Sequence, residues 1–393
     1  MSRPVWVVVA VALALSLGAC SSRTDHSAQP NPSCITDFDP DTDYFPDKST
    51  VADATNFTLS YHYSYQVLTV KRPYPNGRPE SYVLVRCGAP APKLTGDLAH
   101  AAQITVPVNS IYSGSTTQLG MITELGQQHV ITGVANTANV VGARLRERID
   151  AGKIVGYAAG QVNVETVIAG HPDVLVTPGT DDAGYAKLRD AGVAVIADAE
   201  WLEAGPLGRA EWVKVLAALT GTEKKAGELY GKLREDYGAV ARKTAGARPI
   251  EVLPGTMYQG AWSMPAGGDY TGRLLADAGG RYPWADDRRT GSLQLNFESV
   301  YAKAGQAPLW LVTTDWKTLD TVLAADNRYG ELAATRHGQV WSATKALGPG
   351  GGNDYWERGA ARPDLVLGDL VAILHPELTP NHLFVFYRQV ARA

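Results

Sequence analysis

The sequence is poor in cysteine and shows no concentration of positive charge. Its 393 residues include 3 Cys, and its 36 Lys and Arg are scattered among 40 Asp and Glu, which gives a net charge of −4. A protein that binds nucleic acid normally presents a basic cluster, so this balance argues against a nucleic-acid partner. A chain of this length is long enough to bury substantial hydrophobic cores, and we expect two of them.

The motifs of common enzyme and metal sites are also missing. No Gly-x-Ser-x-Gly, His-Glu-x-x-His or Gly-x-Gly-x-x-Gly motif opens the first βα unit. None of the 8 His residues has another His four positions away, so we predict no directly bound metal ion. Gly348 and Gly350 to Gly352 are not followed by Gly-Lys-Ser/Thr, so a mobile loop is a better interpretation than a phosphate-binding loop. We therefore predict no catalytic residue and no cofactor.

What the sequence does contain begins with an export signal. An apolar run from Val5 to Leu17 leads to Leu17-Gly18-Ala19-Cys20, and the run is too short to span a bilayer. Small residues before a Cys at this spacing resemble a bacterial lipobox. Residues 1–19 are thus predicted to be a lipoprotein signal peptide, with Cys20 lipidated and holding the protein on the outer side of the membrane, in the cell envelope. The alternative is an ordinary signal peptidase site with an incidental Cys.

This assignment leads to predictions for the start of the mature chain and for the two remaining cysteines. Residues 20–33 are rich in Ser, Pro and Asn without a large apolar side chain, which predicts a tether. With Cys20 acylated, Cys34 and Cys87 form an even pair in an oxidising compartment, so we predict a disulfide between them. Two unpaired thiols are the alternative.

Residues 34–101 are predicted to form an N-terminal β extension. Apolar and polar residues alternate strictly from Phe57 to Tyr65, as in a half-buried strand. A turn region with Pro75-Asn76-Gly77 follows, and then the apolar run Tyr82 to Val85. This order indicates an antiparallel pair of strands.

From residue 102 the pattern changes to strands that alternate with helices, which predicts an α/β fold with mainly parallel sheets. We expect two βα lobes, 102–207 and 247–393, joined by a linker helix at 208–246. In the linker, Thr222 is a plausible N-cap, and apolar residues recur at helical spacing from Ala226 to Ala241. The predicted strands are 104–108, 130–133, 174–177 and 193–197 in the first lobe, and 250–253, 309–313 and 339–342 in the second.

The two lobes share a local sequence pattern. Residues 162–176 and 295–312 both read apolar-Asn-apolar-Glu-hydroxyl-Val, followed by a helical turn and a buried strand. Such internal similarity indicates a repeated unit. Helix capping by Asn163 and Asn296, with Glu165 and Glu298 near the positive end of the helix dipole, explains the residue types without a binding role.

Candidate ligand-binding residues follow the strands. In open α/β sheets, ligands bind beyond the carboxyl ends of the strands, and an aromatic-lined cleft there suits a bulky, partly planar ligand. Any of these aromatic side chains can instead pack beneath a loop, and Arg288 can pair with neighbouring Asp residues. The predicted ligand-binding set is Tyr112, Ser113, Trp201, Tyr258, Trp262, Arg288, Asn353, Tyr355 and Trp356.

Taken together, these features resemble a known family. A lipobox, two βα lobes joined by one long helix, and the segments WLEAGPLGRAEW (201–212) and NDYWERGAARPDLVLGDL (353–370) are similar to the solute-binding proteins of ABC importers for iron–siderophore, vitamin B12 and haem. The likeness extends from about residue 102 to the C-terminus. The region around Cys34 and Cys87 lies outside it.

This resemblance implies a function and partners. A monomeric, membrane-anchored receptor would hold a metal chelate such as an iron–siderophore, cobalamin or haem between rigid lobes and deliver it to an ABC permease with its ATPase. The family presents one Glu on each lobe to the permease, and the matching residues here are Glu165 and Glu298. Two other classes stay open, namely a secreted α/β enzyme with carboxylates and Arg in its cleft and an envelope lipoprotein without a ligand.

Overall fold

The computed structural model describes residues 34–392, and the account below concerns the compact unit from Ile35 onward. The predicted signal peptide, the tether and the lipidated Cys20 lie outside the described residues. Cys34 and Cys87 are both disulfide-bonded, which confirms the predicted pair. Within residues 34–392, every helix is too short or too polar to cross a bilayer.

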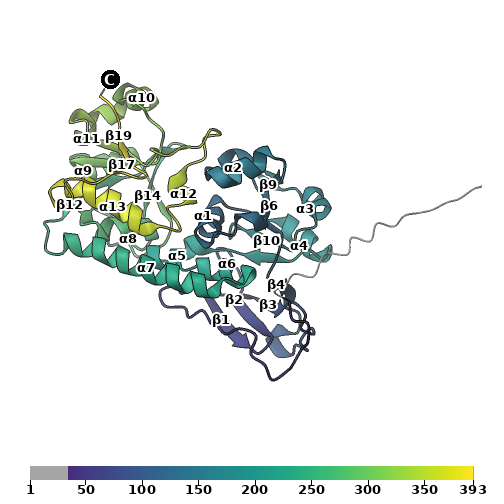
Figure 1. Ribbon diagram of the computed structural model, residues 1–393. Coiled ribbons are helices and arrows are strands. Elements are labelled where there is room, and N and C mark those ends of the chain that lie inside the picture. Colours follow the sequence, from purple (N-terminus) through teal and green to yellow (C-terminus); the bar gives the residue numbers. More distant parts are fainter. Residues whose placement is uncertain (1–33, 393) are drawn as a thin grey trace, which may run out of the picture. The chain divides into compact units, whose positions relative to one another are not determined.

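The described chain begins with a sheet of four strands in the order β1-β2-β3-β4 (Figure 1). Strands β1, β2 and β3 are antiparallel neighbours, whereas β3 and β4 are parallel. One face buries Phe57, Leu68 and Leu84 against the core of the first lobe, and this burial explains the alternating pattern. The strands are β1 (Phe57–His62), β2 (Tyr65–Val70), β3 (Glu80–Arg86) and β4 (Ala102–Val106).

Two sequence predictions for this region are wrong. The single strand predicted from Phe57 to Tyr65 is a hairpin that turns at Tyr63 and Ser64, where His62 pairs with Tyr65. The strand predicted at 104–108 as the first of the N-terminal lobe is β4, which pairs with β3 in the N-terminal sheet. Local alternation cannot reveal which distant strand becomes the partner, because pairing is decided by tertiary contacts.

The N-terminal lobe contains a parallel five-stranded sheet in the order β11-β10-β5-β6-β7. Four helices, α1 to α4, follow its strands. A short hairpin, β8 and β9, precedes α3. The bounds are β5 (Ile111–Ser113), α1 (Thr116–Leu125), β6 (Ile131–Val134), α2 (Ala143–Asp150), β7 (Val155–Gly156), β8 (Ala158–Ala159), β9 (Gln161–Val162), α3 (Val164–Gly170), β10 (Val174–Thr177), α4 (Ala183–Asp190) and β11 (Val195–Ala197).

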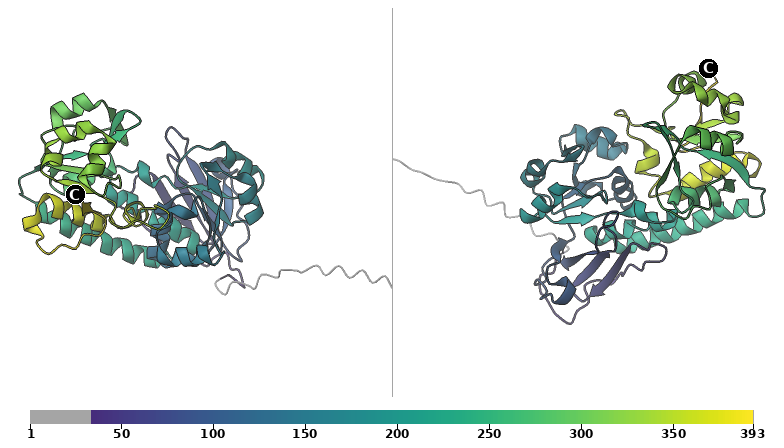
Figure 2. Two further views of the ribbon diagram at one scale, coloured as in Figure 1. Left: turned by 90° about the horizontal axis from the view of Figure 1, so that it is seen from above. Right: turned by 180° about the vertical axis from the view of Figure 1, so that it is seen from behind.

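The linker predicted as one helix is three helices, of which α7 is the longest. They are α5 (Pro206–Ala210), α6 (Val213–Thr220) and α7 (Glu223–Ala241), with α6 entirely buried. The 19 residues of α7 span about 28 Å at 1.5 Å per residue, and its buried face is the predicted one. Thr222 occupies the N-cap position, but its hydroxyl bonds that of Thr220 instead of capping the helix. Figures 1 and 2 show α7 running along both lobes, in contact with α6 and with α13 (Pro363–Leu374).

The C-terminal lobe repeats the α/β order around a second sheet, β15-β12-β17-β18-β19, whose last strand is antiparallel. A separate antiparallel sheet, β13-β14-β16, lies within this lobe. These sheets confirm the predicted α/β class. The bounds are β12 (Ile250–Pro254), β13 (Thr256–Tyr258), β14 (Ala261–Pro265), α8 (Tyr270–Asp277), β15 (Gly280–Arg281), β16 (Ser292–Leu295), α9 (Phe297–Ala304), β17 (Leu309–Val312), α10 (Leu319–Ala325), α11 (Ala333–Arg336), β18 (Val340–Ser342), α12 (Asp354–Glu357) and β19 (Arg388–Gln389).

A short segment before β1, residues 52–56, crosses the linker, and we call it the strap. Its five consecutive backbone N–H groups all donate to two carboxylates of the linker region, Glu211 for 52–54 and Glu203 for 55 and 56, at 2.7–2.9 Å. Both carboxylates are buried. Gly208 allows this approach, because a Cβ there would lie 2.9 Å from the Asp53 carbonyl oxygen. The strap therefore fixes the segment 203–211, which also reaches the cleft described next.

Candidate functional site

A cleft of about 650 Å³ opens between the lobes. The N-terminal lobe and the linker region contribute hydroxyl groups, an amide, an indole and an ion pair to its wall, and the C-terminal lobe contributes hydroxyls, a carboxylate, an amide and a second indole. The residues that carry these groups are Ser115, Thr116, Thr117, Asn139, Glu200, Trp201 and Arg209 on one side, and Thr313, Asp315, Thr344, Asn353 and Trp356 on the other. This volume lies in the range of small-molecule sites.

The cleft lies where a ligand is expected in this type of fold. Ser115 follows β5, Thr313 follows β17 and Thr344 follows β18, so each lies just beyond the carboxyl end of a strand. Ser115 also caps α1, accepting the N–H of Thr117, while Gln118 completes a capping box. The capped N-terminus of α1 therefore forms part of the cleft wall.

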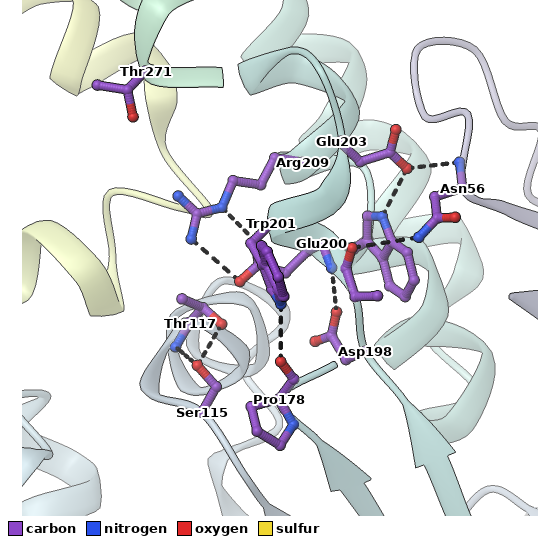
Figure 3. A network of polar contacts seen from close by, with 12 residues as sticks. Asn56, Ser115, Thr117, Pro178, Asp198, Glu200, Trp201, Glu203, Arg209 and Thr271 are labelled. Carbon is purple, nitrogen blue, oxygen red and sulfur yellow. Dashed lines mark hydrogen bonds and ion pairs between the residues drawn. The ribbon is translucent and has the colours of Figure 1, made fainter. Parts of the chain in front are cut away.

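A buried ion pair forms the floor of the cleft (Figure 3). Arg209 donates to Glu200 through Nε and through Nη2, the latter at 3.2 Å. The Arg209 guanidinium also lies over the Tyr270 ring, 4.1 Å from its centre. Because Glu200 neutralises Arg209, this cation adds no net positive charge to the cleft.

Asp198 lies behind this ion pair and is almost fully buried. Its Oδ1 accepts the N–H of Glu200 at 3.3 Å, whereas its Oδ2 has no hydrogen-bond partner among the described residues. Burial raises the pKa of the Asp198 carboxyl well above its usual value, and the negative charge of Glu200 raises it further.

Trp201 is one of the two indoles that line the cleft. Its indole N–H donates to the Pro178 carbonyl at 3.0 Å, which fixes the ring (Figure 3). Gly179 makes room for it, because a Cβ at that position would lie 3.0 Å from the Trp201 Nε1. Trp356, with 38% of its surface exposed, lines the same cleft from the other lobe.

A second hollow of about 380 Å³ adjoins the cleft, and we call it the side pocket. Trp201, Thr313 and Trp356 line both spaces, so the side pocket and the cleft share a mouth. Apart from Trp201, the described residues around it belong to the C-terminal lobe.

The lobes also contact each other directly beside the cleft. The buried carboxylate of Glu357 accepts the N–H groups of Val141 and Gly142 at 2.7 and 2.8 Å. Close to this contact, a Cβ on Gly350 would lie 2.3 Å from the Ala138 carbonyl oxygen. Close packing against the other lobe thus requires glycine at position 350. The sequence analysis interpreted this glycine-rich stretch as a mobile loop and did not predict that contact.

Four of the nine predicted ligand-binding residues line these spaces. Trp201, Asn353 and Trp356 line the cleft, and Tyr355 lines the side pocket. Asn353 also caps α12 and donates to the Ala343 carbonyl, so its amide is partly used by the fold. The structure brings these four together from segments more than 150 residues apart in the sequence.

Two of the predicted residues in the N-terminal lobe do not line the cleft. Tyr112 is buried and stacks on Tyr157, with ring centres 5.3 Å apart. The Ser113 hydroxyl is buried and donates within its own loop, to the Gln118 side chain at 2.7 Å or the Ser115 carbonyl at 2.9 Å. Both belong to strand β5 itself, and the cleft begins two residues later.

Three further predicted residues, in the C-terminal lobe, also lie away from the cleft. Trp262 is fully buried and donates to the Pro254 carbonyl at 3.0 Å. Tyr258 is 66% exposed on β13, and Arg288 is exposed; neither lines the cleft or the side pocket. These five residues are therefore removed from the set that we propose to contact a ligand.

Apart from Asn353, the predicted ligand-binding set omits the polar part of the site. Ser115, Thr117, Glu200, Arg209 and Thr313 all line the cleft. For Ser115 and Thr117 a signal was available, since Ser-Thr-Thr-Gln between a strand and a helix is a capping box at the carboxyl end of a strand. Nothing in the sequence indicates that Arg209 and Glu200 pair across the linker.

A larger hollow lies elsewhere. It measures about 1180 Å³ and separates the N-terminal sheet, around Ser81, from the amino-terminal end of β11, around Val193. Because it lies at the wrong end of that strand for a ligand site of this fold, we assign the candidate site to the cleft.

The two glutamates predicted to dock with a permease are exposed, each in the first turn of a helix. Glu165 lies in α3 and Glu298 in α9, where Glu298 approaches Arg328 at 3.5 Å. Asn163 and Asn296 cap these helices by accepting backbone N–H groups three residues on. Capping thus accounts for both asparagines, and the docking role of the glutamates stays a prediction. Among residues 34–392, no cluster of His, Cys, Asp and Glu is suited to holding a metal ion.

Comparison with known proteins identifies the family. A model of the periplasmic binding protein family matches residues 111–347, which contain β5, the linker and most of the C-terminal lobe. The chain belongs to the periplasmic binding protein family. The match ends shortly before Asn353 and Trp356, so these two residues lie outside the matched segment.

Individual proteins that are similar to this chain agree with this assignment. An uncharacterized lipoprotein of Methanocaldococcus jannaschii is 27% identical over 72% of this chain and 70% of its own length. The periplasmic vitamin B12 binding protein of Vibrio cholerae is similar in structure, with a TM-score of 0.51 and 16% identity over 70% of this chain and 99% of that chain. The periplasmic haem binding protein of Vibrio cholerae has a TM-score of 0.51 and 19% identity over 66% and 98%. At these identities the structural matches speak for the fold alone.

Proposed function

We propose that this protein is the lipid-anchored solute-binding component of an ABC importer and that it carries a metal chelate in the cleft between its lobes. The observation that carries the proposal is the cleft itself: Trp201 and Ser115 face it from one side and Trp356 and Thr313 from the other. A solute held there would contact both lobes at once. Binding would involve no covalent chemistry.

The comparisons support the two finer parts of the proposal. Two structural neighbours bind vitamin B12 and haem, both of which are chelates built on a large ring. The relative from Methanocaldococcus jannaschii is a lipoprotein, which agrees with the lipobox that ends at Cys20.

The charges around the cleft favour a chelate with little net charge. Arg209 is paired with Glu200, and Asp315 is paired with Lys317 and Arg388 at 2.7 and 2.9 Å. Arg288, which was predicted to bind ligand, does not contribute a charge because it lies away from the cleft, and its neighbour Arg289 pairs with Asp287 at 2.6 Å. Among the described residues that line the cleft, Arg209 is the one cation and it is paired, so the cleft offers a polyanion little compensation for its lost hydration.

A titration tests the proposal. The mature protein is titrated with cobalamin, haem, a neutral ferric hydroxamate and a trianionic ferric catecholate, while its tryptophan fluorescence is followed. We expect saturable quenching by an uncharged chelate with a Kd at least about ten-fold lower than that of the catecholate. Trp201→Phe or Trp356→Phe should weaken binding, and Trp341→Phe, which lies outside the cleft, is the matched control. Flat titrations across the panel would contradict a receptor role and favour a lipoprotein without a ligand.

The docking role of Glu165 and Glu298 is tested separately. Because both side chains are exposed and lie outside the cleft, changing both to Ala should leave chelate affinity within about two-fold and abolish uptake in cells that carry the importer. Glu147→Ala with Glu331→Ala, one exposed glutamate from each lobe, is the control and should retain uptake. Lost chelate binding in the first double variant would refute the docking assignment.

A further inference from the structure

The side pocket is a structured recess at the carboxyl ends of β12 and β17. Its wall includes Gly255, directly after β12, and Thr313, directly after β17. Since ligand sites of α/β sheets lie at this edge, the recess is located where a solute would reach it from the cleft.

One wall of the recess is held in place by two indoles behind it. Trp262 donates to the Pro254 carbonyl at 3.0 Å and Trp310 to the Gly255 carbonyl at 2.7 Å. Gly255 has φ +85°, and a Cβ there would lie 2.0 Å from the Ser263 carbonyl oxygen. Both indoles are fully buried, so the carbonyls of this wall are satisfied within the lobe. The shape of this wall is therefore fixed by the packing and hydrogen bonds of the lobe.

Its inner surface is aromatic and aliphatic. The rings of Tyr355 and Tyr387 meet edge to face with centres 5.8 Å apart, and Leu275 and Leu370 close the recess. An apolar ligand group that covers these side chains would remove their surface from water, which favours its binding.

The charge of the recess restricts that group. Asp269 is the one charged residue among the described residues that line it. Its two oxygens accept the backbone N–H groups of Thr271 at 2.8 Å and Gly291 at 3.1 Å, so it is committed to the fold. A negatively charged ligand group would be repelled by this carboxylate, and no lining cation would compensate it.

We propose that the side pocket receives an uncharged, planar aromatic group that projects from the solute held in the cleft. The shared mouth at Trp201, Thr313 and Trp356 lets one molecule occupy both spaces. The two indoles at this mouth and the tyrosines inside provide faces and edges on which such a group packs. This inference rests on the proposed function for the identity of the solute, but the recess can be tested alone.

Benzimidazole serves as the probe of the recess. Its binding to the mature protein is measured by calorimetry and by saturation-transfer NMR. Thr271→Trp fills the recess from the side chain of the second residue of α8, and Ser292→Trp fills it from an exposed position on β16. Both should weaken benzimidazole binding at least about ten-fold. Thr271→Val, which preserves the shape and leaves the recess open, should bind as the unaltered protein does.

The chelates of the titration separate this inference from the proposed function. Cobalamin, which carries a benzimidazole, should lose affinity in Thr271→Trp, whereas the neutral hydroxamate, which has no aromatic group, should bind unchanged. Suppose that no chelate binds the unaltered protein, but that benzimidazole binds it and no longer binds the Trp variants. The side pocket is then a site for an aromatic group, and the assignment of the solute as a metal chelate is wrong. If benzimidazole does not bind, or binds both Trp variants as tightly as the unaltered protein, the inference is wrong.

Discussion

At the scale of single residues, Asp198 is a buried carboxyl group whose surroundings disfavour its ionised form. It lies beneath the cleft with one oxygen lacking a hydrogen-bond partner among the described residues, and its pKa is raised by burial and by Glu200. A carboxyl whose pKa is higher in the folded than in the unfolded chain binds its proton more tightly when folded. The protonated Asp198 therefore stabilises the fold fully at a pH below the pKa of the unfolded chain, near 3.8. This stabilisation is lost as the pH rises through the pKa of Asp198 in the folded protein.

We therefore expect Asp198→Asn to stabilise the protein at neutral pH. The neutral amide removes the penalty of an ionised group in the core, and each unit of pKa difference corresponds to about 1.4 kcal/mol. The free energy of unfolding in urea, measured from pH 4 to pH 8, should fall more steeply with pH in the unaltered protein than in the variant. Asp190→Asn, at an exposed position, is the control. Parallel pH profiles for the Asp198 variant and the unaltered protein would contradict this account.

The cleft residues show which parts of a site can be predicted from single residues. Trp201, Asn353 and Trp356 were found because they follow strands or open a helix, which are local features. Tyr112 and Trp262 were misplaced because sequence shows that a ring is present but not which face of the pleat it occupies. Arg209 was missed because its role depends on Glu200, a partner that only the folded chain supplies.

At the scale of elements, the alternation of strands and helices in both lobes was predictable, but β5 in the N-terminal lobe and the sheet β13-β14-β16 in the C-terminal lobe were not predicted. The strand predicted at 174–177 is β10 at its observed bounds, since a short apolar run is typical of a buried strand. Short elements such as β7 and β8, of two residues each, left no pattern to detect. The strap was also invisible, because its contacts use backbone N–H groups that any residue except proline possesses.

The strap predicts a large effect for one carboxylate of the linker. Glu211 is fully buried, accepts three strap N–H groups and pairs with Lys214. Glu211→Gln would leave Lys214 without its counter-charge and turn an amide N–H₂ toward backbone donors. We expect a loss of about 3–5 kcal/mol in the free energy of unfolding, measured by urea denaturation. Glu228→Gln, exposed on α7, is the matched control and should change stability by less than about 0.5 kcal/mol.

At the scale of the whole molecule, contacts on two sides govern the relation between the lobes. Helix α7 packs on both lobes, and Glu357 joins α12 of one lobe to Val141 and Gly142 of the other. The helix is a continuous stretch of chain that packs on both lobes, whereas Glu357 joins the lobes through two hydrogen bonds. Opening of the cleft therefore requires that these two hydrogen bonds be released.

Glu357→Ala tests this role. Removing the carboxylate deprives the N–H groups of Val141 and Gly142 of their acceptor, so hydrogen exchange of these two amides should become at least about ten-fold faster. Exchange in the core strand β10 should stay unchanged, which distinguishes release of the lobes from general destabilisation. Glu377→Ala, at an exposed position in the same lobe, is the control. Unchanged exchange at 141 and 142 would mean that other contacts hold the lobes together.

The hydrogen bonds of the strap also determine which amino-acid substitutions the strap can accept during evolution. Because Glu203 and Glu211 recognise peptide groups, the side chain at the exposed Ala52 is open to replacement by almost any amino acid. Proline is the exception, since it has no hydrogen to donate. Sequences that descend from this one should therefore accept many different residues at position 52 but no proline. They should keep both Glu203 and Glu211.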